Sequence, residues 1–260
     1  MSVTVVEKMF SGAGSSVVYN AIREWIIEQI PELTLVKTGK SGNDPWWLYK
    51  FGNTDYGLSF YNYKSLWLSV ACGITDNTTG AHQNYQISTS VIKENNSDVY
   101  KAGAAVIRTP QGVIIQGINY ATEKLSETFC YLGKAESAIK GQVSVAGYFG
   151  QAGYIYPNQN DLYQNKVDGS TFFFKIDNET PAVWRHGALT AICPTGSAYG
   201  AAGSIVASAV YGVTSSVWTD PIRIDAFYAL AGPVFPPYYT EVTAGGRKMQ
   251  RVGKELLLEG

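Results

Sequence analysis

The sequence is short of the residues on which most catalytic and metal sites depend. Its 260 residues include only two histidines and three cysteines, and charged residues make up 16%, against about 25% in an average domain. His82 and His186 lie far apart in the sequence, and neither has a cysteine at the close spacing of a metal site. We therefore expect no catalytic residues, no metal site and no cofactor.

Basic clusters and long apolar runs are also missing. The net charge is −1, and the largest basic cluster is the pair Arg247-Lys248, whereas a phosphate-binding surface gathers Lys and Arg on one face. The weakly polar stretch 198–213 is interrupted by glycine and serine, so it is a poor membrane span. The N-terminus has no basic region followed by an apolar run, as a secretory signal would. These absences predict a soluble protein that folds in a cytoplasm and binds neither nucleic acid nor membrane.

The three cysteines predict buried free thiols. Cys72, Cys130 and Cys193 are widely spaced, odd in number and surrounded by apolar neighbours. This usage is typical of small hydrophobic side chains in a reducing compartment.

Aromatic and neutral polar residues take the place of the missing charge. The chain has 18 tyrosines, 6 tryptophans and 27 glycines, with abundant Ser, Thr and Asn. A weakly charged surface repels identical copies little, which suits a protein packed against neighbours. A neutral β-sandwich would have the same composition, and composition alone does not separate the two.

One amphipathic helix is predicted near the N-terminus. Ser15 or Ser16 is the expected N-cap, and Pro31 is expected to end the helix. The apolar stripe consists of Val18, Ile22, Trp25, Ile26 and Gln29 or Ile30, with Arg23, Glu24 and Glu28 on the other side. The stripe predicts that the helix docks onto its own sheet or onto a neighbouring subunit.

The rest of the chain has the pattern of short strands between Gly, Asn, Asp and Pro turns. We expect strands at 33–37, 46–51, 57–63, 66–72, 83–91, 104–108, 113–118, 129–134, 142–149, 171–176, 182–191, 222–229, 238–242, 247–252 and 255–258. The predicted fold class is mainly β, β-sandwich-like or with mixed antiparallel sheets, and with one N-terminal amphipathic helix. We divide the chain into an N-terminal segment and helix (1–32), an aromatic-rich β domain (33–220) and a C-terminal proline-rich arm with terminal strands (221–260).

Two functions other than assembly remain open. Carboxylates beside aromatic residues are typical of glycoside hydrolases, and Asp161, Asp168, Asp177 and Glu179 have such neighbours. However, Asp168-Gly169 and Asp177-Asn178 also have the pattern of turns. The second alternative is a carbohydrate- or host-receptor-binding module, because tyrosine and tryptophan supply stacking faces. Trp46 and Trp47 are adjacent in a predicted strand, so their side chains should lie on opposite faces.

The C-terminal block carries the one family resemblance in the sequence. Pro221-Ile222-Arg223-Ile224-Asp225 is followed by Pro233-Val234-Phe235-Pro236-Pro237-Tyr238-Tyr239 and then by Gly245-Gly246-Arg247-Lys248-Met249-Gln250-Arg251-Val252-Gly253-Lys254. This order of a proline-rich segment, a glycine turn and a final basic strand resembles the endings of virion structural proteins of tailed bacteriophages. The resemblance covers about forty residues, and it implies a tail, neck or baseplate component but no catalytic residue.

The same block has a physical interpretation of its own. Prolines fix φ and donate no hydrogen bond, so the segment around Pro236 is expected to form a rigid extended arm that can lie across a neighbour. The three leucines near the C-terminus should pack internally or add to the sheet edge of a neighbour.

The sequence thus predicts a non-enzymatic structural protein that forms a ring or collar of identical subunits and contacts other virion proteins. It would be assembled in the host bacterial cytoplasm and be present in the virion. The candidate interface residues are Trp25, Trp46, Trp47, Tyr61, Tyr63, Phe235, Pro236, Pro237, Tyr238, Tyr239, Leu256, Leu257 and Leu258.

Overall fold

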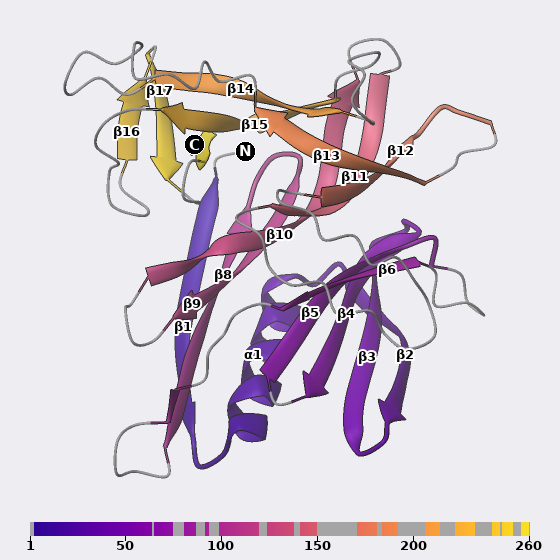
Figure 1. Ribbon diagram of the computed structural model, residues 1–260, viewed down its shortest axis with the longest axis vertical. Coiled ribbons are helices and arrows are strands. Elements are labelled where there is room, and N and C mark those ends of the chain that lie inside the picture. Colours follow the sequence, from indigo (N-terminus) through magenta and orange to yellow (C-terminus); the bar gives the residue numbers. More distant parts are fainter. Residues whose placement is uncertain are drawn as a thin grey trace.

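The fold is mainly β, as predicted. The computed structural model of the chain describes residues 3–63, 65–74, 81–86, 92–93, 99–119, 124–137, 141–149, 171–180, 184–191, 206–213, 222–231, 241–244, 246–251 and 256–259. These residues form a 13-stranded sheet and a 5-stranded sheet (Figure 1). One helix accompanies the two sheets in the described part of the chain. The predicted fold class is therefore confirmed.

The smaller sheet is a meander of consecutive strands. It contains β2 (Leu33–Ser41), β3 (Asp44–Phe51), β4 (Tyr56–Tyr63), β5 (Ser65–Cys72) and β6 (Ala81–Gln86). Each strand pairs antiparallel with the next. The first four correspond to the predicted strands, and β6 begins at Ala81, two residues before the strand predicted at 83–91, so it includes His82.

The larger sheet contains the remaining strands. In spatial order they are β1 (Thr4–Gly12), β8 (Tyr100–Arg108), β9 (Gly112–Asn119), β10 (Lys124–Ser137), β11 (Gly141–Phe149), β12 (Thr171–Ile176), β13 (Arg185–Ala191), β14 (Val206–Val213), β15 (Ile222–Ala231), β18 (Leu256–Glu259), β17 (Arg247–Arg251) and β16 (Glu241–Ala244), with β7 (Ile92–Lys93) beside β8. The turn predicted between β8 and β9 is present, because the Thr109 amide donates to the Gly112 carbonyl at 2.8 Å. Strand β1 had no counterpart among the sequence predictions.

Strands β10 to β15 close into a barrel. They follow one another in the sheet, and β15 also pairs back with β10 through Glu136↔Arg223 and Ser137↔Ile222. This closure leaves fewer free strand edges than an open sheet of the same strands. In Figure 1 the barrel strands form the upper part of the molecule, and the smaller sheet forms the lower part.

Helix α1 (Ser15–Gln29) begins without the side-chain cap expected for it. Its N-cap is Gly14, with no side-chain hydrogen bond, so the predicted cap at Ser15 or Ser16 is wrong. Its C-cap is Ile30, and Pro31 follows as predicted. At this end the Arg108 guanidinium donates to the Gln29 carbonyl at 2.8 Å. Tertiary contacts therefore stabilise both the helix and its C-terminus.

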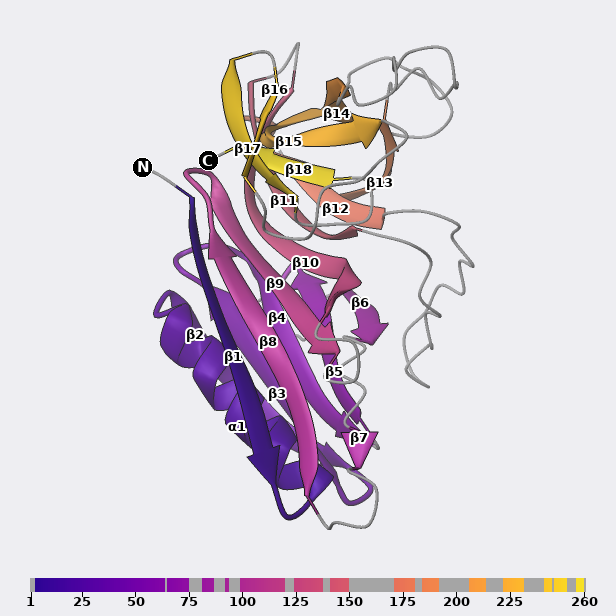
Figure 2. The ribbon, with the colours of Figure 1, turned by 90° about the vertical axis from the view of Figure 1, so that its left-hand side faces the viewer.

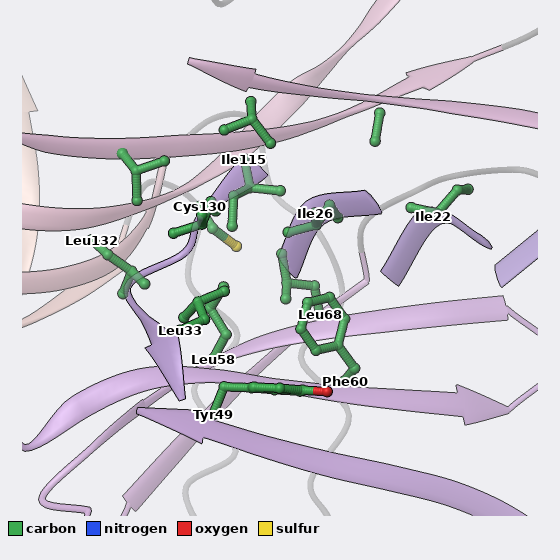
Figure 3. Close-up of a cluster of buried hydrophobic side chains, with 14 of the residues drawn as sticks. Ile22, Ile26, Leu33, Tyr49, Leu58, Phe60, Leu68, Ile115, Cys130 and Leu132 are labelled. Atoms are coloured by element: carbon green, nitrogen blue, oxygen red, sulfur yellow. The ribbon is translucent and has the colours of Figure 1, made fainter. Parts of the chain in front are cut away.

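The helix lies in the core between the two sheets. Figure 2 shows β1 and β8 running along its length. Figure 3 shows Ile22 and Ile26 of the helix among side chains from both sheets, including Phe60 and Leu68 of the smaller sheet and Ile115 of the larger one. The predicted stripe is confirmed, because Val18, Ile22, Trp25 and Ile26 are all buried. The helix docks onto its own chain, which was one of the two predicted outcomes.

The sequence predicted Arg23 on the solvent side of the helix, but the structure places it against the protein. Its side chain is only 11% exposed, and its guanidinium carbon lies 3.7 Å from the centroid of the Trp47 ring. Arginine side chains can cover apolar surface in this way because the guanidinium plane stacks on aromatic rings. Helical periodicity alone could not detect this aromatic partner.

Strand pairing connects the three segments into which we divided the chain (1–32, 33–220 and 221–260). The N-terminal segment contributes β1, which pairs with β8 along its whole length. The C-terminal segment contributes β15, which pairs with β14 and β10. Both ends of the chain are therefore built into the larger sheet.

The buried cysteines give a direct test of this core. Cys72 and Cys130 are free and buried, as predicted, and Cys193 lies outside the described residues. Burial raises the pKa of Cys72 to about 12, and it raises the pKa of Cys130 as well. Because the thiolate is the reactive form, we expect iodoacetamide at pH 8 to modify both about a thousandfold more slowly than a free cysteine. Peptide mass spectrometry should find both modified in urea, and fast labelling of either in the folded protein would contradict the packing described here.

Candidate functional site

A polar pocket lies between the smaller sheet and the barrel strands. It has a volume of about 320 Å³, at the lower end of the range of about 300–1,000 Å³ for small-molecule sites. Its lining consists of Lys50, Asn53, Thr54, Asp55, Lys134, Ser144, Lys175 and Asp177. The first four come from the end of β3 and the turn before β4, and the others come from β10, β11, β12 and the turn that follows β12.

Asp55 forms one half of the charged network in this pocket. Its carboxylate accepts hydrogen bonds from Lys175 Nζ at 2.5 Å and from Trp184 Nε1 at 2.8 Å. The Trp184 ring packs edge-on against Tyr56, with ring centroids 5.6 Å apart. Asp55 belongs to a turn of the smaller sheet, whereas Lys175 belongs to β12 of the larger one. This carboxylate therefore links the two sheets.

The pKa of Asp55 reflects two opposing effects. Burial raises it, but the hydrogen bonds from Lys175 and Trp184 and the charge of Lys175 outweigh burial and hold the pKa below its ordinary value. Asp55 is accordingly a stable acceptor of hydrogen bonds at neutral pH.

Asp177 forms the other half of the network. It accepts hydrogen bonds from Lys134 Nζ and Ser144 Oγ, each at 2.7 Å, and Lys134 also donates to Ser144 at 2.9 Å. The turn predicted at Asp177-Asn178 is confirmed. Lys134 donates to both partners, so it does not have the arrangement of a base that removes the Ser144 proton. Lys134, Ser144 and Asp177 are thus joined by three hydrogen bonds.

The carboxylates considered for hydrolysis lie in different places. Asp177 lines the pocket and is held by Lys134 and Ser144, while Glu179 lies in the same turn and its backbone amide donates to the Ile176 carbonyl. Asp161 and Asp168 lie outside the described residues. Among the described residues, no group of three or more His, Cys, Asp or Glu is placed to hold a metal ion.

The predicted separation of Trp46 and Trp47 is confirmed. Trp47 packs against the main core, whereas Trp46 packs with Leu48, Ala71 and Ile74 on the other face of the smaller sheet. The Trp46 indole lies over Gly39, where an added Cβ would come within 2.5 Å of the ring. Trp46 of β3 pairs with Tyr61 of β4, so the two side chains lie on the same face of the sheet, and both are partly exposed. Trp67 occupies the next register position, opposite Tyr61.

Several other candidate interface residues have neighbours within their own chain. Trp25 is only 6% exposed and packs edge-on against Phe10, so its burial within the chain removes it from the candidate interface. Leu256, Leu257 and Leu258 lie in β18, which pairs with β15 on one side and with β17 on the other. We expected these leucines to pack internally or to add to the sheet edge of a neighbour, and the backbone of β18 is paired on both sides within its own chain.

The remaining candidates are placed only in part. Tyr63 is the last residue of β4 and pairs with Ser65 in the backbone register. Phe235, Pro236, Pro237, Tyr238 and Tyr239 lie outside the described residues.

An exposed strand edge at β1 was not predicted from the sequence. Strand β1 pairs with β8 on one side, and no described strand pairs with its other side. Val6 and Met9 on this strand are 38% and 43% exposed. Val17, which is 56% exposed, lies against Gly12 at the end of the same strand. We call the outer side of β1, with Val6, Met9 and Val17, the β1 edge.

Neither the pocket nor the β1 edge has a clear signal in the sequence. The pocket joins Asp55 to Lys175 across 120 residues of sequence, and such a pair has no local pattern. The β1 edge would have required recognising β1, whose apolar residues are interrupted by Glu7 and Lys8.

Comparisons with known proteins do not assign the chain to a family. No protein-family model, no curated protein and no solved structure matches the chain. Within the described residues, the one helix is too short and too polar to cross a membrane.

Proposed function

We propose that the protein is a non-enzymatic structural component of a tailed-phage virion that associates with copies of itself. The proposal places it in a ring or collar at the tail, neck or baseplate, in contact with other virion proteins. The virion assignment depends on the resemblance of the C-terminal block. The capacity for self-association depends on a separate observation, the β1 edge.

The β1 edge has the properties of a surface for strand addition. Nine residues of backbone, Thr4–Gly12, present hydrogen-bonding groups on a side where no described strand pairs with them. Such an edge is a template for a strand from another chain. Val6 and Met9 lie on opposite faces of β1, because successive side chains alternate. An added strand would thus gain apolar contacts on both faces.

Charge does not prevent an identical chain from approaching. The β1 edge carries one acid and one base, Glu7 and Lys8, and the whole chain has a net charge of −1. Among the described strands, the same sheet ends at β16 on its other side, so each copy has two different edge strands in this sheet. A contact between two different surfaces of identical chains generates a ring when the rotation closes.

Self-association can be tested at the β1 edge with one charge substitution and a matched control. We expect the purified chain to form a discrete oligomer, and Met9→Lys to raise its dissociation constant by about tenfold or more, because the lysine charge would have to be buried in the interface. Leu35→Lys is the control, since Leu35 is 49% exposed on β2 of the other sheet. Light scattering after size exclusion over a range of concentrations measures both variants.

Two results would contradict the proposal at different levels. A wild-type chain that remains monomeric at high concentration, or equal effects of Met9→Lys and Leu35→Lys, removes the β1 edge as the site of association. Absence of the chain from purified phage particles by mass spectrometry removes the virion assignment.

A further inference from the structure

We propose that the pocket between the two sheets binds a small oxyanion-bearing ligand, a molecule about the size of one sugar unit that carries a carboxylate or phosphate. The proposal does not depend on the self-association proposed above, because no residue of the pocket belongs to the β1 edge.

The charge balance of the pocket favours an anion. Its lining contains three lysines and two aspartates. Asp55 is paired with Lys175 and Asp177 with Lys134, which leaves the charge of Lys50 uncompensated. Among the described residues Lys50 has no ion-pair or hydrogen-bond partner. An anionic group beside Lys50 would neutralise the pocket.

The hydrogen-bonding groups favour the same ligand. An ammonium group has three N–H donors, and Lys175 uses one on Asp55, while Lys134 uses two on Ser144 and Asp177. Lys50 keeps all three, and the exposed Asn53 adds an amide. The carboxylates already accept two hydrogen bonds each. Donors are therefore in excess, and oxygen acceptors from a ligand would satisfy them.

The network also holds the pocket in shape before a ligand arrives. Lys175 is only 18% exposed, and its ammonium lies 5.1 Å from the centroid of the Trp184 ring. Lys134 is fixed by its two acceptors. Ammonium groups that are already oriented lose little conformational freedom when a ligand binds, which improves affinity. Because the pocket is small and open to solvent, we expect binding of glucuronate in about the millimolar range.

Ligand-observed NMR and calorimetry on the full chain can test the site with glucuronate, glucose and inorganic phosphate. We expect glucuronate to bind and glucose, which lacks the charge, to bind at least about fivefold more weakly. Phosphate binding as tight as that of glucuronate would support the oxyanion site and identify a free anion as sufficient. Glucose binding as tight as that of glucuronate, or no binding of either anion, would overturn the proposal.

Lys50→Gln is the informative variant, because Lys50 lines the pocket without a partner whose loss would unfold the chain. We expect it to weaken glucuronate binding about fivefold or more and to leave the circular dichroism spectrum unchanged. Lys40→Gln is the matched control, since Lys40 is an exposed lysine of β2 outside the pocket. Unchanged binding in Lys50→Gln, or equal losses in both variants, would assign the affinity to general surface charge and overturn the site.

Discussion

Replacing Phe60 with alanine is expected to lower the free energy of unfolding by about 4 kcal/mol, within the range measured for phenylalanine truncation in protein cores. The Phe60 side chain is 0% exposed in the main core. Its ring meets the ring of Tyr49 edge-on, with centroids 5.8 Å apart. The loss combines the transfer free energy of the ring with the cost of the cavity left behind.

The position of Phe60 makes this cavity difficult to fill. Side chains from α1 and from both sheets surround the same core (Figure 3). Closing the cavity would require one of these elements to move, and each is held by contacts elsewhere in the core. Close-packed interiors relax only partly after such a truncation, so the cost should be near the upper half of the range.

Urea unfolding followed by tryptophan fluorescence measures the effect, with circular dichroism as a second probe. Tyr61→Ala is the matched control, because Tyr61 follows Phe60 on β4, lies on the opposite face and is partly exposed. We expect the control to cost about 1 kcal/mol. Equal losses in the two variants would contradict the assignment of the two faces of β4.

The sequence predicted those elements that have a clear local pattern of apolar residues. Residues 171–176 were predicted as a strand and form β12 with the same bounds. The stripe of α1 and the separation of Trp46 from Trp47 were also predicted, because both depend only on helical or strand periodicity. These features are local, and a local pattern is sufficient to specify them.

Features that depend on distant pairing were not predicted. Strand β1 has mostly exposed residues, so it lacks the alternation that identifies a half-buried strand. The pairing of β15 with β10 joins segments far apart in the chain, and β18 pairs with β15 as well as with its sequence neighbour β17. For Leu256 to Leu258 the sequence left internal packing and the sheet edge of a neighbour both open, because it does not show that the same chain pairs with β18 on both sides.

Asp55 is the residue at which this long-range organisation can be tested most directly. Asp55→Ala removes the acceptor for Lys175 Nζ and Trp184 Nε1. Lys175 is mostly buried, so it would lose its partner without gaining full hydration. Asp55 itself is 35% exposed, and solvent weakens the interaction. We expect a loss of about 2 kcal/mol in the free energy of unfolding.

The loss of stability in Asp55→Ala should be specific to the contact of Asp55 with Lys175 and Trp184, which connects the two sheets. Glu241→Ala is the control, because Glu241 pairs with Lys248 on the surface at 3.0 Å with both side chains more than half exposed, and such pairs contribute less than about 1 kcal/mol. A double-mutant cycle of Asp55→Asn with Lys175→Met isolates the interaction between the two groups. A coupling near zero would show that the pair does not stabilise the fold.

The pH dependence of the unfolding free energy is an independent test of the interaction of Asp55 with Lys175 and Trp184. The pKa of Asp55 is lower in the folded chain than its ordinary value, so the folded state favours the ionised form. The stabilisation is then fully present above the pKa of the unfolded chain, about 3.9, and it is lost as the pH falls through the lower folded pKa. We therefore expect the difference in unfolding free energy between wild type and Asp55→Asn to be largest at neutral pH and to shrink below about pH 4. Glu32, whose pKa is lowered by its hydrogen bond to Arg108, titrates in both proteins, so its contribution cancels in that difference. A difference that grew towards low pH would mean that the carboxyl group is favoured in its protonated form, and the link through Lys175 and Trp184 would have to be abandoned.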